Sequence, residues 1–317
     1  MSGLYYKRVT EGCLGRVKRA IFIVGSGRSG TTMLGSMLGA HPKCIVTPES
    51  QFNEPLSRFD GERFDVRSAL KWLESHPRFR IWDMDIGRLP EVVSTVGSHR
   101  EFLYRIVEEY ARGKHPDKDA EIWVDHTPSN VKKIVELSEI YPDALFIHIY
   151  RDGRAVAASR RKAGWRGDGV VESATVWMQR VGMGFSAECM HPDRVFHISY
   201  ENLVTHPEKS LKRISDFAGI DFSEEMVSAD GFIVPGYTKH QHTLVGKRPD
   251  ISRIDAWREY LDEREIEIFE NIAGEMLGIL GYERLYDNPR RIKRSERVLY
   301  ALKRKIRHLS RAVSGWI

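Results

Sequence analysis

The chain has 317 residues, of which 41% are hydrophobic and 29% charged, and its formal net charge is +5. This length suits one large α/β domain, and the composition is that of an ordinary globular protein. Charged residues interrupt every apolar segment before it reaches the length of a membrane span, which argues against a protein that crosses a bilayer.

The amino-terminal residues 1–19 lack the uninterrupted apolar stretch of a secretory signal, so we expect a cytoplasmic protein. The three cysteines, Cys13, Cys44 and Cys189, are far apart and offer no spacing that binds zinc or forms a redox pair. We therefore expect neither a metal site nor a disulfide.

Short apolar segments alternate with helical patterns along the chain. Residues 20–25 predict a strand, and the helix-compatible residues 31–40 end at His41-Pro42. Further β-rich runs lie at 121–124, 144–150 and 194–199. This alternation predicts an α/β fold with a mostly parallel sheet covered by helices.

We divide the chain into three parts. Residues 1–19 form a lead-in, residues 20–286 the main domain, and residues 287–317 a basic tail. Within the main domain, the aromatic-rich segment 51–120 has no strand pattern, and we expect a helical insertion over the active face.

The segment GSGRSGTTML, which starts at Gly25, follows the first strand and opens the first helix. In this context backbone N–H groups and the helix dipole bind anions. The glycine spacing is that of a phosphate loop, but Thr31-Thr32 replace the Lys-Ser/Thr of nucleoside triphosphatases. The positive charge is at Arg28 instead, which suits a donor with a single 5′-phosphate.

The stretch VGSGRSGTTMLGSMLGAHP resembles the 5′-phosphosulfate loop of sulfotransferases, in the Arg-containing form of tyrosylprotein and bacterial carbohydrate-type enzymes. The resemblance implies a three-layer αβα sandwich of the P-loop-containing nucleotide-binding type. It also implies 3′-phosphoadenosine 5′-phosphosulfate as sulfuryl donor, used without a metal. The donor-binding loop residues would be Ser26, Gly27, Arg28, Ser29, Gly30, Thr31 and Thr32.

A second segment, IYRDGRAVAAS, follows the strand at 144–150 and is similar to the 3′-phosphate site of the same family. There, an Arg at the strand end and a Ser on the next helix bind one phosphate, which assigns this role to Arg151 and Ser159. By the same resemblance Tyr200 is a candidate adenine contact. Lys247 and Arg248 would belong to a basic loop over the 3′-phosphate.

Sulfuryl transfer to a hydroxyl needs a general base, for which we favour Glu49 in the segment VTPESQF. This is the position of the catalytic glutamate in the Arg-containing branch, and Glu54 is the nearest competitor. A base that works near neutral pH should be partly desolvated, with a raised pKa.

The leaving oxygen needs a cation, and family members often use a Lys in a Lys-Thr-Pro segment. Here the segment WVDHTPSN has His126 at that position. His126 either donates a hydrogen bond when protonated or is itself the base, oriented by Glu49. A structural histidine at a strand end is the third interpretation.

The tail 287–317 contains ten Lys and Arg against two acids, a balance of +8, which leaves the preceding residues at −3. Apolar residues recur at helical spacing, at Leu299, Leu302, Ile306, Leu309 and Val313. This helix either makes a peripheral contact through residues 290–317 with the anionic inner membrane surface, or packs on the domain or a second subunit.

The sequence therefore predicts a sulfotransferase, and the family resemblance favours a carbohydrate or glycolipid hydroxyl as acceptor. Two alternatives are a P-loop small-molecule kinase that uses ATP and Mg²⁺, and a non-catalytic membrane or nucleic-acid adaptor. The missing Walker lysine argues against the kinase, and the negative charge of residues 1–286 argues against a broad nucleic-acid footprint. The oligomeric state stays open.

Overall fold

A computed structural model describes residues 15–163, 169–234, 249–298, 300 and 302. Its centre is one sheet of five parallel strands in the order β2-β3-β1-β4-β5. The strands are β1 (Arg19–Gly25), β2 (Cys44–Thr47), β3 (Ile122–Asp125), β4 (Leu145–Tyr150) and β5 (Val195–Ser199). Four of these match the predicted strands, whereas β2 appeared in the sequence only as a short extended run.

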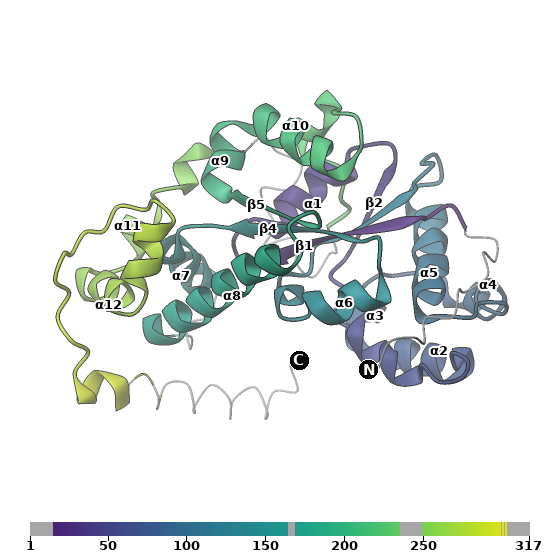
Figure 1. Ribbon diagram of the computed structural model, residues 1–317, viewed down its shortest axis with the longest axis horizontal. Helices are drawn as coiled ribbons and strands as arrows, with labels where there is room; N and C mark the ends of the chain where they lie inside the picture. Colours follow the sequence, from purple (N-terminus) through teal and green to yellow (C-terminus); the bar gives the residue numbers. More distant parts are fainter. Residues whose placement is uncertain (1–14, 164–168, 235–248, 299, 301, 303–317) are drawn as a thin grey trace, which may run out of the picture.

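Helices cover both faces of the sheet (Figure 1). They are α1 (Thr31–Gly39), α2 (Val66–Ser75), α3 (Pro77–Arg80), α4 (Leu89–Val92), α5 (His99–Lys114), α6 (Ile134–Ile140), α7 (Gly153–Lys162), α8 (Val170–Met190), α9 (Tyr200–Thr205), α10 (Pro207–Ala218), α11 (Trp257–Tyr260) and α12 (Glu263–Ile279). Short 3₁₀ turns join several of them, among them η1 (Glu54–Phe59), η3 (Pro128–Lys132) and η6 (Ile251–Arg253).

Alternate residues of each strand point to opposite faces, and because helices cover both faces, most strand residues are apolar. In β1, Phe22 and Val24 pack with residues of α2–α6 on one face. Ile21 and Ile23 pack with α1, α9 and α10 on the other. The fold is therefore the predicted α/β sandwich of three layers.

Strand β1 is central because it pairs with β3 on one side and with β4 on the other. The carboxyl ends of parallel strands meet at one edge, which is where α/β proteins bind ligands. The segments after β1 and β4 are the two that the sequence assigned to phosphate binding.

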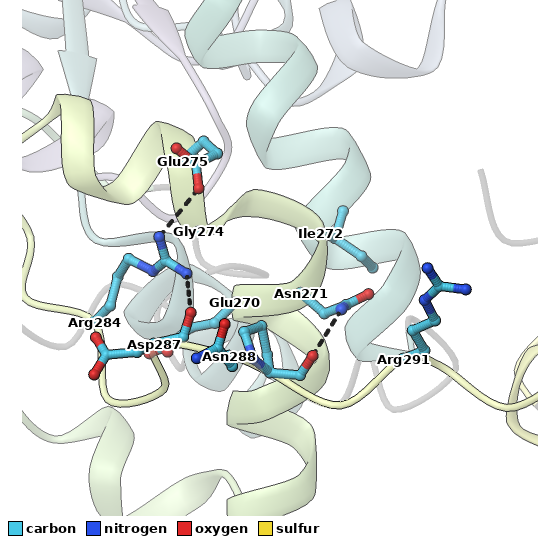
Figure 2. Close-up of a pocket in the computed structure, with 10 residues that line it drawn as sticks. Glu270, Asn271, Ile272, Gly274, Glu275, Arg284, Asp287, Asn288 and Arg291 are labelled. Carbon is cyan, nitrogen blue, oxygen red and sulfur yellow. Dashed lines mark hydrogen bonds and ion pairs between the residues drawn. The ribbon is translucent and has the colours of Figure 1, made fainter.

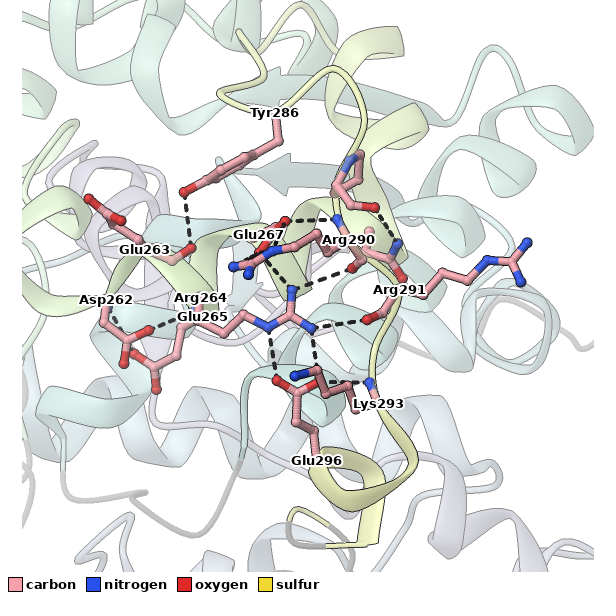
Figure 3. Close-up of polar contacts among 12 residues, drawn as sticks. Asp262, Glu263, Arg264, Glu265, Glu267, Tyr286, Arg290, Arg291, Lys293 and Glu296 are labelled. Atoms are coloured by element: carbon pink, nitrogen blue, oxygen red, sulfur yellow. Dashed lines mark hydrogen bonds and ion pairs between the residues drawn. The ribbon is translucent and has the colours of Figure 1, made fainter.

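The start of the tail is fixed to α12 (Figure 3). Arg290 forms an ion pair with Glu267 at 2.8 Å, and Arg264 of α12 pairs with Glu296 at 2.8 Å. Between these contacts, Ile292 is buried among residues of α7, α8 and α12. Of the apolar residues that predicted the tail helix, only Leu302 lies within the described residues, and it is exposed.

No helix among the described residues is long and apolar enough to span a bilayer.

Candidate active site

The loop between β1 and α1 has the backbone of an anion site. Gly30, immediately before α1, has φ 99°, which favours glycine. A Cβ at Gly30 would lie 2.7 Å from the Tyr200 ring, so a side chain has no room either. Arg28 has φ 76°, uncommon for a residue with a side chain and typical of functional loops.

Hydroxyl groups gather in this loop. Ser26, Ser29, Thr31 and Thr32 are all buried. The Oγ atoms of Ser26 and Ser29 have no hydrogen-bond partner among the described residues. Buried hydroxyls normally find partners, so these two fit a bound anion that accepts from them.

Arg28 connects the two predicted phosphate sites. Its Nε donates to the Oγ of Ser159 on α7 at 3.1 Å, and its carbonyl oxygen accepts from Nη1 of Arg151 at 3.4 Å. Burial lowers the pKa of the Arg28 guanidinium, Arg151 lowers it further, and Glu49 opposes them. The structure thus brings together the loop, the end of β4 and α7, as the sequence predicted.

Arg151 is held in place by several contacts. Its Nη2 donates to the carbonyl oxygen of Arg253 at 2.6 Å, and its guanidinium carbon lies 4.1 Å from the ring centre of Tyr200. Tyr200 therefore stands between Arg151 and Gly30, beside the loop. The second arginine of the RDGR run, Arg154, points elsewhere, since it forms ion pairs with Asp152 and Glu270.

Glu49 follows β2 and keeps part of its surface in solvent. Burial raises the pKa of its carboxyl group. The guanidinium of Arg78 opposes this most strongly, followed by a hydrogen bond from Gln51 (3.0 Å) and the charges of Arg28 and Arg180. The raised pKa and the neighbouring loop suit a general base.

A buried network positions the segment that carries Glu49. The carboxylate of Asp125, at the end of β3, accepts hydrogen bonds from Ser50 Oγ and from Asn53 Nδ2. The backbone N–H of Ser50 donates to Oγ1 of Thr127 at 2.9 Å. This network did not emerge from the sequence, although its signal was present as a run of polar residues after two adjacent strands.

His126 is buried beside α1. Its ring packs edge-on against Phe232 at 4.9 Å, and a Cβ at Gly35 would lie 3.0 Å from the His126 Cβ. Both ring nitrogens lack a hydrogen-bond partner among the described residues. Burial lowers the pKa of His126 to about 4, against the opposing charge of Asp125. The imidazole is therefore neutral near pH 7, which disfavours a protonated His126 as donor to the leaving oxygen.

Three candidate residues cannot be placed. Lys247 and Arg248 lie outside the described residues, and so does the side chain of Glu54. Conversely, the structure adds Arg78 from α3 and Arg180 from α8, which sequence reasoning missed because neither belongs to a motif.

A separate pocket of about 330 Å³ lies against the outer side of α12 (Figure 2). Its lining comes from α12 and the following segment, including Asn271, Arg284 and Asn288, and contains no residue of the phosphate loop. Among the described residues there is also no group of three or more His, Cys, Asp or Glu side chains that could hold a metal ion.

The fold and the loop together define an α/β protein that binds a phosphorylated donor at the end of its central strand. Residues 20–224 match the model of the sulfotransferase family, and the chain belongs to this family. It is an enzyme, and its donor is 3′-phosphoadenosine 5′-phosphosulfate, which the buried hydroxyls and paired arginines fit. The kinase and adaptor alternatives are not supported.

Named relatives are protein-tyrosine sulfotransferases. Protein-tyrosine sulfotransferase 2 of Gallus gallus is 27% identical over 282 residues, which cover 85% of this chain and 70% of that protein. Protein-tyrosine sulfotransferase 1 of Homo sapiens is 25% identical, with the same shares covered.

Two solved structures share the fold. The sulfotransferase domain from the curacin biosynthetic pathway has a TM-score of 0.58 and 20% identity, and covers 85% of this chain and 99% of that chain. The sulfotransferase domain of the Synechococcus PCC 7002 olefin synthase has a TM-score of 0.54 and 21% identity, and the match covers 81% of this chain and 95% of that chain.

Proposed function

We propose that the chain transfers the sulfuryl group to the phenolic hydroxyl of a tyrosine in a peptide with acidic flanking residues. This acceptor replaces the carbohydrate or glycolipid that the sequence favoured. The names of the relatives support a tyrosine. We infer the acidic flanking residues from Arg78. Among the cations near Glu49, Arg78 lowers the pKa of the Glu49 carboxyl group most strongly.

Arg78 belongs to a small cationic surface next to the base. Arg78 and Arg58 both lower the pKa of His76, after the larger effect of burial, so the three groups are close. Arg58 also lies over the ring of Trp72, with its guanidinium carbon 4.5 Å from the ring centre. Two cations beside a half-buried aromatic ring suit a peptide that carries carboxylates beside an aromatic side chain.

In the reaction, Glu49 takes the proton of the acceptor hydroxyl as its oxygen forms a bond to sulfur. The bond between sulfur and the phosphate oxygen breaks, and the electron pair stays on that oxygen. Arg28 and the amides and hydroxyls of the loop stabilise this charge, while Arg151 and Ser159 hold the 3′-phosphate. Tyr200 borders the adenine.

The test compares peptides in which one tyrosine is flanked by Asp and Glu, by Ser, or by Lys, together with a set of sugars. Mass spectrometry reports the addition of one sulfuryl group. We expect turnover of the acidic peptide, about 10-fold or more above the Ser peptide in kcat/KM, and little of the Lys peptide. Sulfated sugars with unmodified peptides would overturn the proposal.

Arg78→Ala should raise KM for the acidic peptide about 10-fold and leave KM for the Ser peptide nearly unchanged. Arg80, on the same short helix, is exposed and donates to the backbone of Glu74. Arg80→Ala is therefore the matched control, and it should behave as wild type with both peptides. Equal loss with both peptides in Arg78→Ala would contradict a role in charge recognition.

A further inference from the structure

The reaction places negative charge on the leaving phosphate oxygen, and a cation close to this oxygen stabilises that charge. Arg28 donates to Ser159, and Arg151 donates to the backbone carbonyl of Arg253, so each has a contact that fixes it within the donor site. His126 is buried against Phe232 with both nitrogens unpaired by described residues. A second cation at the loop would share with Arg28 the charge that develops on this oxygen.

Arg180 occupies such a position. It is on α8, and its Nη1 lies 3.7 Å from the point where a Cβ on Gly27 would stand. The guanidinium group therefore lies next to the backbone of the phosphate loop, on the side of Gly27. A larger residue at position 27 would reduce the space between Arg180 and an anion bound by the loop.

Arg180 is also electrostatically coupled to the proposed base. The charges of Arg180 and Glu49 stabilise each other, and Arg160 repels Arg180. The Nε atom of Arg180 is buried and has no hydrogen-bond partner among the described residues. This guanidinium lies close to both the loop and the base, and its unpaired Nε–H can donate a hydrogen bond to an anion bound by the loop.

We propose that Arg180 is a catalytic residue that binds the sulfuryl group and the leaving phosphate oxygen. As the bond from sulfur to the acceptor oxygen forms and the bond from sulfur to the phosphate oxygen breaks, the electron pair remains on the phosphate oxygen. The guanidinium of Arg180 stabilises this charge, and the acceptor proton goes to Glu49. This inference rests on the sulfuryl transfer proposed above, but not on the identity of the acceptor.

A merely structural Arg180 would act only as a charge partner for Glu49. In that case Arg180→Ala would raise the pKa of Glu49, and the acidic limb of the pH–rate profile would move to higher pH. The limiting kcat at high pH would stay at the wild-type value. A catalytic Arg180 instead predicts a lower limiting kcat.

The first measurement needs no acceptor. Adenosine 3′,5′-bisphosphate and adenosine 3′-phosphate are titrated by calorimetry into wild type, Arg180→Ala, Arg180→Lys and Gln179→Ala. Arg180→Ala should weaken the bisphosphate about 10- to 100-fold and leave adenosine 3′-phosphate unchanged, since only the bisphosphate has the 5′ anion. Gln179 is an exposed neighbour on α8, and its variant should bind as wild type.

The second measurement is turnover. Arg180→Ala should reduce the limiting kcat about 10²- to 10³-fold, as loss of a transition-state donor does elsewhere. Added guanidinium chloride should restore part of this activity in Arg180→Ala, and Arg180→Lys should retain more than the alanine variant. Unchanged bisphosphate affinity with a wild-type limiting kcat would overturn the proposal. Equal weakening of both nucleotides without rescue would also overturn it, because it would show a structural role.

The two proposals fail in different ways. If wild type binds the bisphosphate but modifies no tyrosine peptide, the acceptor assignment is wrong, and the calorimetry still decides the role of Arg180.

Discussion

The Nε atom of Arg28 and the Oγ atom of Ser159 are 3.1 Å apart, so a single arginine links the phosphate loop to α7. Arg151 donates to the backbone carbonyl of the same arginine. The two halves of the donor site are therefore joined through Arg28, and they should respond together to substitution.

The donor site can be tested by calorimetry with adenosine 3′,5′-bisphosphate in metal-free buffer, using adenosine 5′-phosphate for comparison. Arg151→Ala and Ser159→Ala should each weaken the bisphosphate about 10-fold or more and leave adenosine 5′-phosphate nearly unaffected. Arg161 on α7 is exposed and pairs with Glu265, so Arg161→Ala serves as control. Identical affinities for the two nucleotides in wild type would mean that the 3′-phosphate is not recognised.

Glu49→Gln should reduce kcat about 10²- to 10⁴-fold, because a carboxamide cannot accept the acceptor proton. Affinity for the bisphosphate should be retained. In wild type the base must be ionised, so activity falls as pH drops through the raised pKa of Glu49.

Gln51 offers a finer test of the same base. Its amide donates to Glu49 and lowers the pKa of that carboxyl, so removal of the amide should move the acidic limb to higher pH. Gln51 has φ 46°, and Gln51→Gly accepts this backbone without strain. An unmoved acidic limb would indicate that another group is the base.

Two glycines of α8 should respond in opposite ways to alanine. A Cβ at Gly184 would lie 2.3 Å from the His148 ring, so Gly184→Ala should lower the free energy of unfolding by about 1–3 kcal/mol. A Cβ at Gly182 meets only Met276 at 4.0 Å, so Gly182→Ala should stabilise the helix by up to about 1 kcal/mol. Urea unfolding measures both variants, and equal effects would contradict the packing of α8 on β4.

Buried histidines should make the fold sensitive to acid. Burial lowers the pKa of His148 from 6.5 to about 3, so the folded protein resists a proton that the unfolded chain accepts. The stability is complete above pH 6.5 and decreases as the pH falls below this value. At pH 5 the loss from one such residue is about 2 kcal/mol.

Urea unfolding gives the free energy of unfolding at pH 7 and at pH 5. The difference between these two values should be smaller in His148→Gln than in wild type. His206 is exposed, and His206→Gln should keep the wild-type difference. An unchanged pH dependence in His148→Gln would show that other groups determine the acid sensitivity.

The basic tail is best cut after its described contacts. Arg290 and Ile292 hold the start of the tail on α12, so deletion from residue 287 should also lower stability. Deletion of residues 303–317 should abolish sedimentation with anionic vesicles and leave nucleotide binding intact. Sedimentation that persists after this deletion would contradict the interpretation of these residues as a membrane contact.

The sequence predicted the elements that depend on local pattern. Apolar runs in the sequence predicted β1 and β4, and the glycine spacing predicted the phosphate loop. Strands β2 and β3 have four residues each, a length at which periodicity does not distinguish a strand from an extended loop, and of the two only β3 was predicted.

Residues outside motifs could not be found in this way. Arg78 and Arg180 come from helices that are far apart in the sequence, and only the packing of those helices brings them to Glu49. Burial lowers the pKa of His126, and one of the side chains packed against its ring is Phe232, more distant still along the chain. Spacing within a segment carries no information about such contacts.

The hydrogen bonds from Ser50 and Asn53 to Asp125 have a dynamic consequence. Edge strands such as β2 have partners on one side only, and they open more easily than strands inside a sheet. Glu49 lies two residues after this edge strand, yet the next residue, Ser50, is hydrogen-bonded to Asp125 at the end of interior strand β3. When β2 frays, the carboxylate should keep its place relative to the donor loop, so local opening of the edge need not interrupt turnover.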